Sequence, residues 1–100
     1  MPFDQFVPVP FTSRAIGTHA PTAAGVYGIS NAREWIYIGE TDDIQAALFQ
    51  HLQDIHTSLM KRQPTGFVFE TCDGARRSVR QDRLVLEYEP VCNRQQAAHL

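Results

Sequence analysis

Cysteine is scarce in this chain of 100 residues, and long apolar runs are absent. The two cysteines, Cys72 and Cys92, stand in no spacing typical of a metal site, so we expect two shielded thiols, with a disulfide as the alternative. No apolar run approaches the roughly 20 residues that span a bilayer. The first residues lack a basic stretch leading into an apolar one, so we expect no secretory signal and a cytoplasmic location.

Positive charge is limited and unevenly distributed. Nine lysines and arginines face 11 acidic residues, and a net charge of −2 gives little support for a large surface that binds polyanions. Residues 1–60 hold two arginines against six carboxylates, whereas residues 61–100 hold seven basic against five acidic side chains. Any surface that attracts phosphate should therefore come from the C-terminal half.

Length and composition indicate one globular domain with a modest core, because 43% of the residues are hydrophobic and 20% are charged. We expect an extended N-terminal strap over residues 1–24, a folded unit over 25–93 and a C-terminal tail over 94–100. The strap is expected to wrap the core, with a short helical turn near residues 12–16. Its apolar side chains are those of Phe3, Phe6, Val7, Val9 and Phe11.

Two apolar segments separated by polar or small residues predict a hairpin of two strands over residues 26–30 and 35–39. If it closes symmetrically around Ala32, Tyr27 lies opposite Tyr37. Both side chains then share one face of the sheet, although a bulge would move the register.

Helical spacing predicts a helix that begins at the N-cap Asp42, with Gln45 as its capping-box partner, and runs to about residue 62, either unbroken or with one break. A third strand follows over residues 66–71, and a last helix begins at Asp73 or Gly74 and reaches about residue 88. The expected fold is α/β, of the α+β type, with a three-stranded antiparallel sheet flanked by helices in the order β-β-α(α)-β-α. The first helix should bury Ile44, Leu48, Leu52, Ile55 and Leu59.

Two motifs carry the functional information. Residues 25–51 contain Gly-Val-Tyr, a turn, Tyr-Ile-Gly and then an amphipathic helix with a histidine, and residues 90–93 read Pro-Val-Cys-Asn. Together they resemble the GIY-YIG nuclease superfamily. The resemblance implies phosphodiester hydrolysis, which needs a group to activate water, a cation to neutralise the phosphate and a divalent metal held by a carboxylate.

The resemblance also implies roles for residues that the chain retains. Tyr27 would be the base or would position water, and Tyr37 would assist it across the hairpin. His51 fits a helix position that carries histidine in some members, and Asn93 ends the Pro-x-x-Asn. Taken singly, each tyrosine is more simply explained by packing on a small sheet, but the joint pattern favours a site.

Two positions on which this chemistry depends are changed. Four residues before His51 stands Ala47, where the resemblance implies an arginine that clamps phosphate. Nine residues before the proline at position 90 stands Gln81, where the resemblance implies a metal-binding glutamate. An uncharged amide should bind Mg²⁺ far more weakly than a carboxylate does. Glu40 also stands at a position that is often basic in relatives. We therefore expect no cofactor, with Mg²⁺ or Mn²⁺ needed only if the site is active.

Arg77 and Arg80 of the last helix are candidates for binding the substrate together with Asn93. Arg77 lies one turn before Gln81, and Arg80 follows a neighbouring line of the helix. The arginines could contact phosphate from the opposite side of the cleft. Alternatively, they belong to a solvated basic face paired with acidic residues of the same helix.

Three functions are compatible with this pattern. We favour a nuclease-like domain that has lost catalysis and binds nucleic acid or phosphate through the remnant cleft. One alternative is an active metal-dependent endonuclease with a rearranged site, which would cut DNA. The other is a protein-interaction or regulatory module, which the net acidic character and the apolar N-terminal segment would suit.

Overall fold

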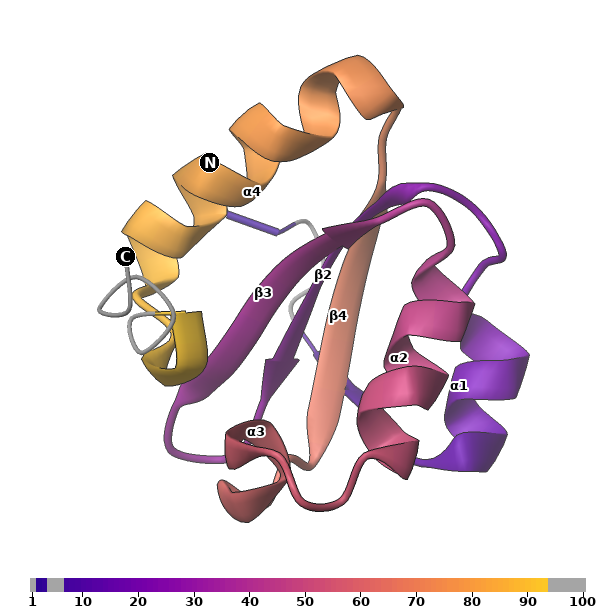
Figure 1. The fold of residues 1–100 in the computed structure, drawn as a ribbon, viewed down its shortest axis with the longest axis vertical. Coiled ribbons are helices and arrows are strands. Elements are labelled where there is room, and N and C mark those ends of the chain that lie inside the picture. The colour runs from indigo at the N-terminus through magenta and orange to yellow at the C-terminus, as the bar shows by residue number, and fades with distance from the viewer. Residues whose placement is uncertain (1, 4–6, 94–100) are drawn as a thin grey trace.

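An antiparallel sheet carries helices on both of its faces (Figure 1). The computed structural model describes residues 2–3 and 7–93. The strands are β1 (Val9–Pro10), β2 (Gly25–Ser30), β3 (Trp35–Thr41) and β4 (Gly66–Thr71), in the spatial order β1-β4-β2-β3. The helices are α1 (Ser13–His19), α2 (Ile44–Gln53), α3 (Ser58–Lys61) and α4 (Gly74–Tyr88). The predicted α+β class is confirmed, but the sheet has four strands rather than three.

The additional strand, β1, pairs with β4 through Val9 opposite Phe67 and Pro10 opposite Gly66. Alternation cannot reveal a strand of two residues, and proline is unusual in strands. Because proline lacks an N–H group, it is tolerated at the edge of a sheet, which is where β1 lies.

The N-terminal segment contributes to the core, as expected, but it also forms a longer helix than the predicted turn. Phe3 and Phe11 are buried, whereas Val7 is 79% exposed. Thr12 caps α1, because its hydroxyl oxygen accepts a hydrogen bond from the N–H of Ala15 at 3.1 Å. Phe6 and the tail expected over residues 94–100 lie outside the described residues.

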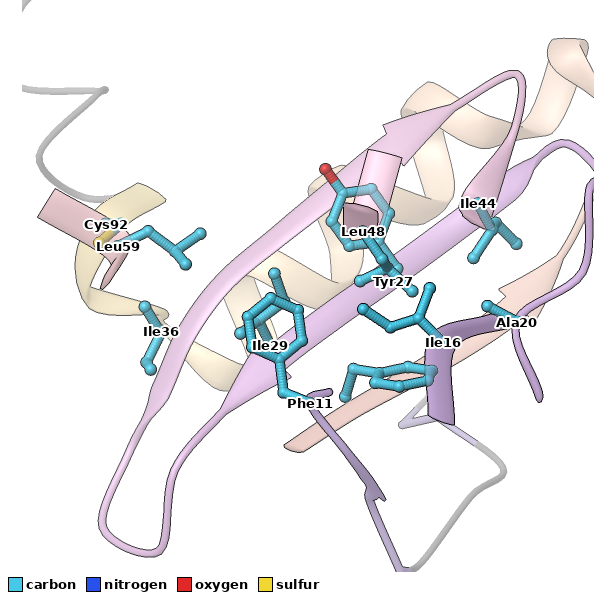
Figure 2. Packing of buried hydrophobic residues seen from close by; sticks show 11 residues of the cluster. Phe11, Ile16, Ala20, Tyr27, Ile29, Ile36, Ile44, Leu48, Leu59 and Cys92 are labelled. Carbon is cyan, nitrogen blue, oxygen red and sulfur yellow. The ribbon is translucent and has the colours of Figure 1, made fainter. Parts of the chain in front are cut away.

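Two apolar layers pack against the two faces of the sheet. α1 and α2 lie side by side on one face and α4 lies on the other (Figure 1). The layer beneath α4 contains Phe3, Val26, Ile38, Val68 and Leu84. The layer beneath α1 and α2, shown in Figure 2, contains Phe11, Ile16, Ala20, Tyr27, Ile29, Ile36, Ile44, Leu48, Leu59, Phe67 and Cys92.

The register of β2 and β3 differs by two residues from the symmetric hairpin. Tyr27 lies opposite Gly39, Ile29 lies opposite Tyr37, and a bulge follows at Ser30. The direct pairing of the two tyrosines is therefore wrong. Their shared face is confirmed, because a shift of two residues leaves every side chain on the same side of the sheet.

α2 begins one residue later than the sequence indicates. Asp43 is the N-cap, since its carboxylate accepts a hydrogen bond from the N–H of Ala46 at 3.0 Å. Gln45 is not a capping-box partner, and its side-chain amide instead donates to the carbonyl of Ala20 at 3.2 Å. Asp42, the expected cap, is left free to pair with another element.

The break between α2 and α3 covers residues 54–57, so Ile55 leaves the apolar face and is 63% exposed. Its predicted burial is wrong, because polar residues in this stretch favour helix caps over a continuous helix. The hydroxyl oxygen of Thr57 caps α3 by accepting a hydrogen bond from the N–H of Met60 at 3.3 Å. The bounds expected for β4 and α4 are confirmed, with Asp73 as the N-cap of α4.

Candidate functional site

Tyr27, Tyr37 and His51 form one aromatic cluster between the sheet and α2. Tyr27 Oη lies 2.8 Å from His51 Nε2. The ring centroids are 6.1 Å apart for the two tyrosines, and His51 lies 5.6 Å from Tyr27 and 5.3 Å from Tyr37. Since the three residues come from β2, β3 and α2, both the hairpin and the helix must form before they meet.

Gly39 leaves room for this cluster. A Cβ atom at this position would lie 2.6 Å from Tyr27 Oη and 2.8 Å from Tyr37 Cε2, closer than real Cβ contacts come. A side chain at position 39 would therefore displace one of the tyrosines. The glycine of the Tyr-Ile-Gly motif is therefore required here by the close approach of the two tyrosine side chains.

Burial determines the protonation states of the cluster. Burial, and to a lesser extent Tyr37, raises the pKa of the Tyr27 phenol. Burial lowers the pKa of His51, while Asp54 opposes that shift. His51 is therefore neutral near pH 7, and its Nε2 accepts a hydrogen bond from the Tyr27 hydroxyl. Because the pKa of the phenol is raised, Tyr27 keeps its proton and does not act readily as a base.

A pocket of about 330 Å³, which we call the aromatic cleft, opens beside the cluster. Within the part of the chain that the structure describes, its lining contains the carboxylates Glu40 and Asp54 but neither lysine nor arginine. Two like charges make the cleft unfavourable for an anion such as a phosphodiester. The lining residues are Tyr27, Glu40, Thr41, Ala47, Gln50, His51, Asp54 and Thr57.

The amides of Gln81 and Asn93 both bind the backbone of Ile38 in β3. Gln81 Nε2 donates to the Ile38 carbonyl at 3.1 Å. Asn93 Nδ2 donates to the same carbonyl at 2.9 Å, and its Oδ1 accepts from the Ile38 N–H at 2.7 Å. Because β3 is an edge strand, Asn93 pairs with it as a further strand would. The amides thus hold α4 and the residues after it against the sheet.

Arg77 and Arg80 each contact a carboxylate from another element, and neither lines the aromatic cleft. Arg77 Nη1 lies 2.6 Å from Asp42 Oδ1, in the loop before α2. Arg80 donates to both carboxylate oxygens of Glu70 in β4, at 2.7 and 2.8 Å, and to the carbonyl of Pro2 at 3.1 Å. These pairs connect α4 to the rest of the fold.

The arrangement of hairpin, helix and aromatic cluster has counterparts among solved structures. The GIY-YIG N-terminal endonuclease domain of UvrC from Thermotoga maritima, bound to magnesium, aligns over 78% of this chain and 91% of its own length. The TM-score is 0.66 at 20% identity. This chain has the GIY-YIG fold. Two point mutants of the same domain, one replacing a tyrosine and one an asparagine, cover the same 78% at 20% identity. They cover 90% of their own lengths, with TM-scores of 0.65 and 0.66.

The chain matches no protein-family model and no curated protein. At 20% identity the likeness concerns the GIY-YIG fold rather than the activity. None of the helices that the structure describes is long and apolar enough to cross a membrane.

Position 81, where the resemblance places a metal-binding glutamate, does not suit the divalent cation bound by these GIY-YIG structures. Mg²⁺ prefers oxygen ligands that include at least one carboxylate. Gln81 offers a neutral amide whose nitrogen is already bound to Ile38, and its neighbour Asp82 is exposed. Residues 2–3 and 7–93 contain no group of three or more His, Cys, Asp or Glu side chains that could hold a metal.

Sequence reasoning places four residues around one space, and the GIY-YIG fold brings them together: Tyr27, Tyr37, Ala47 and His51. Asn93 and the two arginines lie elsewhere, bound to backbone or carboxylates. Thr57 is a lining residue that the sequence does not reveal, because it reaches the cleft only after the chain breaks before α3. The binding or catalytic roles of all these residues stay predictions.

Proposed function

We propose that this GIY-YIG-fold domain binds nucleic acid without hydrolysing it. The charge of the aromatic cleft is the observation that carries the proposal. The cleft is lined by Tyr27 and His51, with Tyr37 packed against them. Its charged residues are Glu40 and Asp54, and Ala47 stands where a cation would be needed.

Hydrolysis of a phosphodiester concentrates negative charge on the phosphate in the transition state. Loss of one group that stabilises such charge typically slows an enzyme by about 10²–10³-fold. Among the described residues no lysine or arginine lines the cleft, position 81 offers an amide in place of a carboxylate, and Glu40 and Asp54 repel the phosphate. The raised pKa of Tyr27 also disfavours hydrolysis, because the phenol resists giving up its proton and is then unable to act as the base.

Support for nucleic acid as the partner comes from the fold, which is also that of an endonuclease domain, and from cations outside the cleft. Phosphate binding through Arg77 and Arg80 has weaker support, because both guanidinium groups already contact carboxylates. The binding surface is therefore better sought where lysine and arginine side chains have no close acidic partner.

The test is a cleavage assay on labelled single-stranded, duplex and branched DNA with Mg²⁺ and with Mn²⁺, alongside a binding assay at low salt. We expect binding, but no cleavage above that of Tyr27→Phe. Cleavage by the native chain that disappears in Tyr27→Phe would contradict loss of catalysis. Absence of binding at low salt, where electrostatic attraction is strongest, would contradict the nucleic-acid partner and favour a protein-interaction module.

A further inference from the structure

A second pocket, which we call the hairpin pocket, lies where the β2–β3 turn meets α3 and the residues after it. The turn and α3 lie at the lower end of the molecule in Figure 1. The pocket has a volume of about 440 Å³ and shares no residue with the aromatic cleft. Its lining consists of Asn31, Ala32, Arg33, Glu34, Lys61, Arg62, Gln63 and Thr65.

Asn31 joins the two walls of this pocket. Its Nδ2 donates to the carbonyl of Arg62 at 2.8 Å, across the pocket from its own turn. Its Oδ1 accepts from the N–H groups of Arg33 and Glu34 at 2.8 and 2.9 Å. The N–H of Thr65 donates to a carbonyl of β2 at 2.9 Å, which adds a second link. The pocket is therefore formed before any ligand arrives, which reduces the ordering cost of binding.

The cations of the hairpin pocket are weakly neutralised. Within residues 2–3 and 7–93, Arg33 and Lys61 make no ion pair. Arg62 lies 3.6 Å from Glu34, and its side chain is 42% exposed, so this pair contributes little. By contrast, the ion pairs of Arg77 and Arg80 close at 2.6 and 2.7 Å. Three cations thus face a single carboxylate in this pocket.

We infer that the hairpin pocket binds phosphate groups of a nucleic-acid backbone. Arginine donates two parallel hydrogen bonds to phosphate oxygens and lysine adds a compact positive charge, which suits the lining. The Thr65 hydroxyl and the Gln63 amide supply neutral donors. The inference rests on the proposed function, since nucleic acid is the partner named there, but it assigns the phosphate contact to a separate place.

α3 lies between the hairpin pocket and the aromatic cleft, so the two lie near each other. Thr57, the N-cap of α3, lines the aromatic cleft, and Lys61, its last residue, lines the hairpin pocket. Four residues of helix advance by about 6 Å. Glu40 and Asp54 would therefore repel any phosphates that extend from the hairpin pocket toward the cleft, which keeps the strand out of it.

The test uses the full chain and a labelled single-stranded oligonucleotide, with affinity measured by fluorescence anisotropy over a range of salt concentrations. The double variant Arg33→Glu with Lys61→Glu removes the two unpaired cations. The matched control, Arg14→Glu with Arg76→Glu, makes the same change of net charge on exposed helix residues outside both pockets. The neutral variant Arg33→Gln with Lys61→Gln serves if charge reversal impairs folding.

We expect the pocket variant to bind at least about tenfold more weakly at low salt, with a shallower salt dependence, whose slope falls by about 0.7 for each lost phosphate contact. The control variant should lose only a few-fold in affinity for the oligonucleotide. The affinity of the neutral variant should lie between those of the pocket variant and the control. Equal losses in pocket and control variants would overturn the inference, because net charge alone would then explain binding. Unchanged binding by the pocket variant would also overturn it, while leaving the proposed function intact. A native chain that binds no oligonucleotide would contradict both.

Discussion

The aromatic cleft and the hairpin pocket differ in charge although a single turn of helix separates them. Thr57 at the start of α3 lines the first, and Lys61 at its end lines the second. Among the described residues, the cleft has two carboxylates and no lysine or arginine, whereas the pocket has three cations and one carboxylate. A polyanion is therefore attracted to one and repelled by the other.

Shape and charge are maintained by different constraints in this fold. Tyr27 is 4% exposed and belongs to the main apolar layer, as Figure 2 shows, so its replacement disturbs packing. Glu40 and Asp54 are exposed, and exposed charges can change at little cost in stability. The aromatic cluster can thus be kept whether or not charges suited to catalysis accompany it, so its presence alone is no evidence of activity.

The largest expected effect comes from restoring both changed positions, with Ala47→Arg and Gln81→Glu together. The arginine would supply the missing cation and the glutamate a charged ligand, a difference worth about 10²–10³-fold for the cation alone. We expect calorimetry to detect Mg²⁺ binding and an assay on labelled DNA to detect weak cleavage. Ala47→Arg alone is the control and should bind no metal. A double variant without Mg²⁺ binding would show that these two positions are misplaced.

Replacing Asn93 tests whether a residue of the nuclease motif now serves folding. Asn93→Ala removes two hydrogen bonds and leaves the Ile38 N–H buried without a partner, so we expect a loss of about 3 kcal/mol in the free energy of unfolding. The control Gln81→Ala removes one hydrogen bond to the same strand and should cost about 1 kcal/mol. Urea unfolding measures both. Equal losses in the two variants would contradict the strand-like pairing of Asn93.

Reversing the charge of the cleft should narrow the contrast between the two regions. Glu40→Lys with Asp54→Lys removes the repulsion, and we expect oligonucleotide affinity at low salt to rise by about tenfold. Cleavage should remain absent. Asp82→Lys with Glu89→Lys makes the same change on exposed residues elsewhere. If this control raises affinity as much, the cleft has no special role in repelling the strand.

The smallest effect concerns pH. Burial lowers the pKa of His51 in the folded chain, whereas an unfolded histidine titrates near 6.5. Below that pH the unfolded chain binds more protons at this histidine than the folded chain does. The contribution of His51 to stability is therefore present above about pH 6.5 and is lost as the pH falls through the pKa of the folded state. We expect the free energy of unfolding to fall between about pH 7.5 and about pH 5.5, and His51→Gln to flatten that fall. An identical pH dependence in both proteins would contradict the buried, neutral His51.

Much of the fold could be predicted because its signals are local. β4 follows from the short apolar run over residues 67–69, and α4 begins after the N-cap Asp73. The shared face of Tyr27 and Tyr37 survives an error of two residues in register, since side chains alternate with a period of two. β1 is too short to produce a pattern, and its pairing with β4 depends on the tertiary fold.

The candidate site was only partly predictable for the same reason. Counting along the helix places Ala47 and His51 beside one cleft, because the spacing of four residues is a property of the helix itself. The partners of Arg77 cannot be read in this way, since Asp42 lies 35 residues away in the chain. The hairpin pocket likewise depends on a hydrogen bond between Asn31 and Arg62, which only the folded chain brings together.

The most direct test of the contrast is a nuclear magnetic resonance titration of the ¹⁵N-labelled full chain with a single-stranded oligonucleotide at low salt. We expect amide shift changes that concentrate in residues 31–34 and 61–65 and leave Tyr27, Glu40 and His51 nearly unchanged. Shift changes centred on the aromatic cleft, with residues 31–34 and 61–65 unaffected, would contradict phosphate binding in the hairpin pocket.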